Sequence, residues 1–182
     1  MNTRKLITRA LVPGAVLLAI VVIGGLMGYR LNTTASMPLG LWKQGDTVHR
    51  GAYATACIDH QTPTAAMAFE RNYMPEGECP SGYAPLLKQI VAMPGDTVTL
   101  TDDAVIVNGK PIPNTRTNRH DSKGRPMQFI ERGTYTVAQG EYWLIANQHP
   151  NSYDSRYFGP VRASAILSTM LPVVTKAYPT AT

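Results

Sequence analysis

The sequence has only two cysteines in 182 residues and no acidic residue among its first thirty. So few cysteines exclude a miniprotein built on a disulfide framework, and a hydrophobic content of 44% excludes a disordered segment. Four of the 17 basic residues lie in the first thirty, at Arg4, Lys5, Arg9 and Arg30, so the rest of the chain carries thirteen basic and twelve acidic residues. A body this close to neutral excludes a broad phosphate-binding surface, and we expect no nucleic-acid partner.

A charge-free run of twenty residues, Ala10–Tyr29, follows the basic N-terminus. As a helix it would span about 30 Å, the thickness of the hydrocarbon core of a bilayer. Three basic residues precede the run and one follows it, which predicts a cytoplasmic N-terminus and an exported body. We expect residues 1–30 to form a single-pass anchor in the inner (cytoplasmic) membrane and residues 31–182 to form one periplasmic domain. A secretory signal cleaved near Thr33 or Ala35 is the alternative.

The exported body consists of short alternating stretches separated by turn residues, which predicts a mainly β fold, an antiparallel sheet or barrel. The expected strands are Gly51–Cys57, Leu86–Met93, Thr97–Thr101, Ala104–Val107, Thr134–Val137, Glu141–Ala146 and Ala165–Val174. One short helix is expected over Thr64–Met74, with Thr62 as its N-cap and Pro63 in its first position. Asn114–Met127 is polar and has no periodicity, which is typical of a surface loop.

Cys57 and Cys79 bracket the stretch that contains this helix. In an oxidising compartment such a pair predicts a disulfide. Zinc binding is the alternative, because Cys57 and His60 have a C-x-x-H spacing, but no fourth ligand is evident. We therefore expect no metal and no cofactor.

Common catalytic signatures such as G-x-S-x-G and H-E-x-x-H are absent. Attention falls instead on the segment around Lys88. In an extended strand Leu86, Lys88, Ile90 and Ala92 share one face, and three of these four side chains are apolar. If that face is buried, desolvation lowers the pKa of the amine and makes it a usable base. If the strand is at an edge, the amine reaches solvent instead.

Two other segments can be interpreted only together with Lys88. Ser36 lies seven residues beyond the charge-free run, where it is either a linker serine or a nucleophile close to the membrane. Ser152, Asp154 and Arg156 share a face if their segment is extended, so Asp154 and Arg156 can pair and Ser152 can contact a nearby amine. The alternative for this segment is a solvated strand end.

In order along the chain, Ser36-Met37-Pro38, Lys88 followed by Pro94-Gly95-Asp96, and the segment 151–160 (Asn-Ser-Tyr-Asp-Ser-Arg-Tyr-Phe-Gly-Pro) resemble the type I signal peptidases. These are membrane-anchored serine peptidases with a Ser/Lys dyad. The stretch Ser-Met-Pro-Leu-Gly-Leu-Trp and the cysteine-bracketed segment most resemble the TraF-type conjugative transfer peptidases, which mature pilin subunits. General signal peptidases carry Gly-Asp-Asn where this chain has Ala146-Asn147-Gln148, and they place a residue between Met and Pro, which is absent here.

The resemblance implies a role for each site residue. Ser36 would be the nucleophile and Lys88 the general base, while Ser152 would orient Lys88. Asp154 would support the site, and Arg156 would brace Asp154. The Thr34 hydroxyl would help the Ser36 N–H to bind the oxyanion.

The expected substrate is the membrane-bound pilin precursor of a conjugative transfer system, released by hydrolysis or by ring closure. A general leader peptidase acting on other exported preproteins is one alternative. The other is a non-catalytic anchored scaffold, in which Ser36 and Lys88 would lie far apart and 114–127 would contact a partner.

Overall fold

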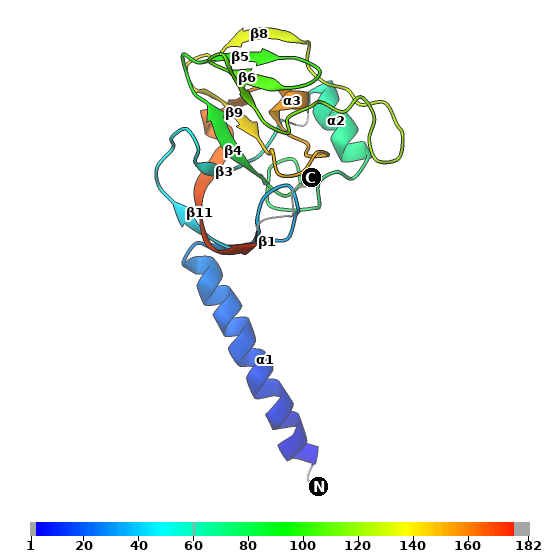
Figure 1. The fold of residues 1–182 in the computed structure, drawn as a ribbon. Coiled ribbons are helices and arrows are strands. Elements are labelled where there is room, and N and C mark those ends of the chain that lie inside the picture. Colours follow the sequence, from blue (N-terminus) through cyan, green and yellow to red (C-terminus); the bar gives the residue numbers. More distant parts are fainter. Residues whose placement is uncertain (1–2, 60, 177–182) are drawn as a thin grey trace.

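The computed structural model describes residues 3–59 and 61–176 of the chain. Its first element is the helix α1 (Thr3–Leu26), which extends away from the β-rich body in Figure 1. Gly28 lies just beyond the end of α1 in the left-handed region, with φ +82°, and turns the chain into the first strand at Tyr29. The helix therefore ends three residues before the end of the expected run Ala10–Tyr29.

In the part of the chain that the structure describes, no helix combines the length and the hydropathy that a membrane span needs. The span expected over Ala10–Tyr29 thus stays a prediction. From Val12 onward the large apolar side chains of α1, such as Leu17, Leu18 and Ile20, are more than half exposed.

The body consists of two antiparallel sheets, as the mainly β prediction required (Figure 1). The larger sheet has the order β1-β2-β11-β3-β4-β9-β10. Its strands are β1 (Tyr29–Asn32), β2 (Leu39–Gly45), β3 (Tyr53–Ala56), β4 (Leu86–Ala92), β9 (Glu141–Ile145), β10 (Val161–Arg162) and β11 (Ile166–Lys176). The last long strand, β11, therefore lies between the β1–β2 hairpin and the strands β3 and β4.

The smaller sheet has the order β7-β6-β5-β8. Its strands are β5 (Thr97–Leu100), β6 (Val105–Val107), β7 (Lys110–Ile112) and β8 (Gly133–Thr136). Apolar side chains from this sheet and from β4 and β9 form one buried cluster, which includes Val98, Val105 and Trp143. This cluster fixes the smaller sheet against the end of β4 that lies farthest from Leu86.

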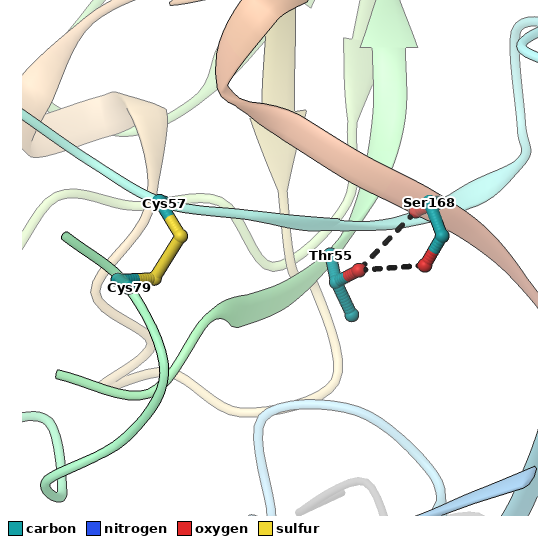
Figure 2. Close-up of a disulfide and its surroundings, with 4 residues drawn as sticks. All are labelled: Thr55, Cys57, Cys79 and Ser168. Carbon is teal, nitrogen blue, oxygen red and sulfur yellow. Dashed lines mark hydrogen bonds between the residues drawn. A yellow bond between two sulfur atoms is a disulfide. The ribbon is translucent and has the colours of Figure 1, made fainter. Parts of the chain in front are cut away.

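The cysteine-bracketed segment contains α2 (Pro63–Glu70), shorter than the expected Thr64–Met74. Thr62 is its N-cap, as predicted, because its Oγ1 accepts from the backbone N–H of Ala65 at 3.3 Å. Cys57 and Cys79 form the predicted disulfide, shown in Figure 2. The zinc alternative is wrong because both sulfurs are bonded to each other; His60 lies outside the described residues.

Figure 2 also shows a polar link beside the disulfide, between β3 and β11. Thr55 Oγ1 lies 3.0 Å from Ser168 Oγ and 3.3 Å from the Ser168 carbonyl oxygen. Two residues further along, the Cys57 N–H donates to the Ala165 carbonyl, at the end of the short 3-10 helix η1 (Ala163–Ala165). The disulfide thus lies directly beyond the end of β3, the central strand of the larger sheet.

Candidate active site

Ser36 lies in the loop 33–38, which joins β1 to β2 and is called here the serine loop. The two strands pair in register up to Asn32 and Gly40, so the loop is a short closed turn at the end of a hairpin. Ser36 itself is half-buried, while its neighbours Met37 and Pro38 are buried. The hairpin therefore presents the partly accessible Ser36 hydroxyl beside the buried side chains of Met37 and Pro38.

Lys88 shares a face of β4 with Ile90 and Ala92, as the alternating pattern predicted, and this face is buried, which the pattern had left open. Its side chain is only 3% exposed, and the residue opposite it in β3 is the fully buried Ala54. Burial lowers the pKa of Lys88 from an ordinary 10.5 to about 8, against a smaller opposing effect from the negative charge of Asp154. The alternative in which Lys88 reaches solvent from an edge strand is wrong.

Two hydroxyl groups meet the Lys88 amine. Its Nζ lies 2.9 Å from Ser36 Oγ and 3.0 Å from Ser152 Oγ. These are hydrogen-bond distances, so one amine connects the serine loop to the segment that carries Ser152. The scaffold alternative expected Ser36 and Lys88 to be far apart, and this distance contradicts that expectation.

The segment around Asp154 is not extended throughout, so the expected common face of Ser152, Asp154 and Arg156 is wrong. Asp154 is the N-cap of a four-residue helix, α3 (Ser155–Phe158), because its carboxylate accepts from the Arg156 N–H. The expected pairing of Asp154 and Arg156 is present: Nε and Nη2 of Arg156 lie 2.8 Å from the two carboxylate oxygens. Both side chains are fully buried, and the alternative of a solvated strand end is wrong.

This ion pair is tied to the rest of the site through backbone groups. Asp154 accepts from the Ala146 N–H at the end of β9, and Arg156 donates to the Arg116 carbonyl at 2.7 Å. Arg156 Nη2 also lies 3.1 Å from the Ser152 carbonyl oxygen. The pair thus holds the backbone of the residue whose hydroxyl meets Lys88.

Thr34 is exposed, and its hydroxyl donates to Asn32 Oδ1 at 2.8 Å. A carboxamide oxygen can only accept, so the hydroxyl hydrogen is committed to Asn32. Donation from Thr34 to an oxyanion would require this hydroxyl to rotate.

A cavity of about 460 Å³ opens beside Ser36 and Lys88. Its wall includes Tyr73 and Met74 from the cysteine-bracketed segment, and Asp121 and Met127 from the polar loop. These two parts are joined to each other, because the Tyr73 hydroxyl donates to Asp121 at 2.6 Å. The loop 114–127 is therefore an ordered part of the cavity wall, although sequence reasoning assigned it only to the surface.

Within residues 3–59 and 61–176, no cluster of His, Cys, Asp and Glu side chains is arranged to hold a metal ion. Sequence reasoning missed one residue beside the serine loop, Asn32 at the end of β1, whose side chain bonds to five groups of the chain between Thr34 and Pro38. The signal was present, because asparagine two residues before a threonine commonly bonds the backbone of a turn.

Comparison with known proteins identifies the same family that the sequence motifs indicated. The sequence model of the family described as "Signal peptidase, peptidase S26" matches residues 7–174. A plasmid transfer protein TraF of Escherichia coli is 38% identical over 151 residues, which cover 82% of this chain and 85% of that protein. A second one from Escherichia coli is 34% identical and covers 94% of this chain and 97% of the relative.

A conjugal transfer protein TraF of Agrobacterium fabrum is 35% identical over 178 residues, which cover 96% of this chain and 98% of that protein. The resemblance to the type I signal peptidases and to their TraF-type branch is thereby confirmed. The chain belongs to the signal peptidase S26 family.

Proposed function

We propose that this chain is a serine endopeptidase in which Ser36 is the nucleophile and Lys88 the general base. The observation that carries this proposal is the contact of a desolvated amine, with a pKa of about 8, with the Ser36 hydroxyl at 2.9 Å. A nucleophilic serine needs a neighbouring base within hydrogen-bond reach, and Ser-Lys pairs are one known solution. Membership of the signal peptidase S26 family supports this reaction class.

In the proposed mechanism neutral Lys88 accepts the Ser36 proton as Oγ attacks the scissile carbonyl carbon. The negative charge on the carbonyl oxygen is met by the Ser36 backbone N–H, and by the Thr34 hydroxyl if that group rotates away from Asn32. Protonated Lys88 then gives its proton to the leaving amine, which leaves an ester on Ser36. Ser152 accepts from the amine throughout and keeps it directed at Ser36.

We propose a pilin precursor of a conjugative transfer system as the substrate. The names of the relatives, which are plasmid and conjugal transfer proteins, support it. So does the sequence Ala146-Asn147-Gln148, which differs from that of general signal peptidases. Water releases the acyl group by hydrolysis, and an amine of the substrate releases it by ring closure.

We further propose that α1 anchors the chain in the cytoplasmic membrane, with the N-terminus cytoplasmic and the body in the periplasm. The large apolar side chains of α1 support this, since from Val12 onward they are more than half exposed to solvent among the described residues. The Cys57–Cys79 disulfide also supports an oxidising compartment.

The test uses the purified full chain in detergent, incubated with a pilin precursor and with an ordinary secretory preprotein. We expect the pilin precursor to be cut, and Ser36→Ala and Lys88→Ala each to abolish the cut while the protein stays folded. Mass spectrometry separates the outcomes, because a cyclic product lacks one water. Preferential cleavage of the preprotein would support a general signal peptidase, and normal turnover by Lys88→Ala would refute the proposed base.

A further inference from the structure

We infer that Asn32 is a positioning residue for the Ser36 nucleophile, an inference that rests on the proposed peptidase function. Its Nδ2 donates to the carbonyl oxygens of Thr34, Met37 and Pro38, at 3.0, 3.1 and 3.0 Å. Its Oδ1 accepts from the Thr34 N–H at 3.1 Å and from the Thr34 hydroxyl at 2.8 Å. One side chain thus contacts the serine loop on both sides of Ser36.

These contacts require a carboxamide. Carbonyl oxygens surround one end of the side chain and donors meet the other, so the orientation of the amide is fixed by its partners. An aspartate would place a charged oxygen against the carbonyl groups, and an alanine would leave them without these donors. Asn32 is also the last residue of β1 to pair with β2, so the group that shapes the loop is anchored in the sheet.

These contacts hold the serine loop, and with it Ser36, in one place relative to the sheet. The loop has a second attachment beyond Ser36, where Trp42 Nε1 also donates to the Pro38 carbonyl at 3.1 Å. On the side that precedes Ser36, Asn32 is the one described side chain that hydrogen-bonds the loop, through its bonds to Thr34. Losing Asn32 therefore frees the side of the loop that leads into Ser36, while the Lys88–Ser152 contact remains.

A role of Asn32 in positioning Ser36 and a role in stabilising the fold predict different effects of its substitution. If Asn32 acts through Ser36, its loss lowers kcat and leaves KM nearly unchanged, because the cavity wall is intact. The midpoint of the pH profile also stays in place, because burial of Lys88 on β4 is unchanged. A purely structural role would lower the melting temperature without separating kcat from KM.

The test compares Asn32→Ala and Asn32→Asp in the full-length protein. The matched control is Asn108→Ala, which removes an asparagine that bonds Thr97 and Asp96 away from the cavity wall. We expect kcat for the pilin precursor to fall by about tenfold or more, since an error of about 1 Å in geometry costs on the order of a hundredfold. KM should stay within about twofold and the pH midpoint should not move. Hydrogen exchange should increase in residues 33–38 and in no strand of the larger sheet.

Asn32→Ser provides a second variant in case the others fold poorly, because serine can still bond the turn through its hydroxyl. It lacks the Nδ2 donors, so we expect it to lose as much kcat as alanine. A kcat within twofold of wild type, or unchanged exchange in residues 33–38, would overturn the role of Asn32. If Ser36→Ala cleaves as fast as wild type, the peptidase proposal and this inference fail together; if Ser36→Ala is inactive while Asn32→Ala is fully active, this inference fails alone.

Discussion

Arg156 holds both carboxylate oxygens of Asp154 at 2.8 Å, in a pair with no exposed surface on either side chain. The same guanidinium reaches the Ser152 carbonyl, two residues before Asp154. Because the Ser152 hydroxyl lies 3.0 Å from Lys88 Nζ, the ion pair acts on the base through the backbone. Four predictions concern this chain of contacts and the elements around it.

Arg156→Met should destabilise the protein strongly, because it leaves the Asp154 carboxylate buried without its counter-charge. Removal of one partner of a buried ion pair costs about 3–5 kcal/mol. The free energy of unfolding, measured in urea with and without the substitution, gives the loss directly.

Arg119→Met is the matched control, because Arg119 pairs with Asp102 at 2.7 Å but both side chains are about half exposed or more. Such a surface pair contributes less than about 1 kcal/mol. Equal losses in the two variants would show that burial of the Asp154–Arg156 pair has no energetic consequence.

The pH dependence of cleavage should follow Lys88. Only the neutral amine can take a proton, so kcat/KM should rise with pH and reach half its plateau near pH 8. Stability should rise as well between about pH 8 and 10.5, because in this window the unfolded chain binds a proton at Lys88 that the folded chain does not.

Lys88→Met should remove that rise in stability between pH 8 and 10.5, together with all activity. Thermal melts of wild type and variant across this range provide the comparison. A flat activity profile down to pH 5 in wild type would contradict a lysine base.

Ser152→Ala should lower kcat by about fivefold to tenfold, the value of one ordinary hydrogen bond, because Lys88 loses the partner that directs it at Ser36. Ser152→Thr keeps a hydroxyl and should recover part of the loss. Single-turnover cleavage of the precursor measures both, with the exposed Ser164→Ala as control. If Ser164→Ala lowered kcat by the same factor, the loss in Ser152→Ala would not report the contact of Ser152 with Lys88.

Replacing Cys57 and Cys79 together by serine should destabilise the protein by about 3 kcal/mol, since the disulfide closes a loop of 22 residues. The same loop carries Tyr73 and Met74 of the cavity wall, so KM for the precursor should rise while the pH midpoint stays near 8. Melting curves and Michaelis kinetics at a temperature well below the transition measure the two effects. Unchanged KM would show that the wall is held by other contacts, such as that of Tyr73 with Asp121.

Much of the fold was predictable from local pattern. Simple alternation put Lys88 on one face with Leu86, Ile90 and Ala92 but left open whether that face is buried, and all seven expected strands are present with shifted ends. The strands β1, β2, β7 and β10 were missed, because each is short or interrupted and is defined by its partner; β2, for example, contains Gly40. The helix α3 has four residues, which is too few to show a helical period.

The site was predictable only in part for the same reason. The proximity of Ser36 and Lys88 depends on contacts between segments 52 residues apart, which no local pattern reveals. The common face of Ser152, Asp154 and Arg156 depended on an extended segment, and the role of Asp154 as the N-cap of a very short helix is visible only in three dimensions. The contacts of Asn32 are local, but they matter only once the adjacent loop is known to reach the lysine.

The position of β11 has a consequence for how the proposed Ser36–Lys88 dyad is assembled. Within the larger sheet, the hairpin that carries Ser36 pairs with β11, the last strand of the described chain, and β11 pairs in turn with β3, the neighbour of the Lys88 strand β4. Gly40 shows how closely they fit, since a Cβ there would overlap the Val174 carbonyl oxygen. Closure of the larger sheet between Ser36 and Lys88 therefore requires residues 166–176, so the proposed dyad depends on a segment more than a hundred residues further along the chain than the serine.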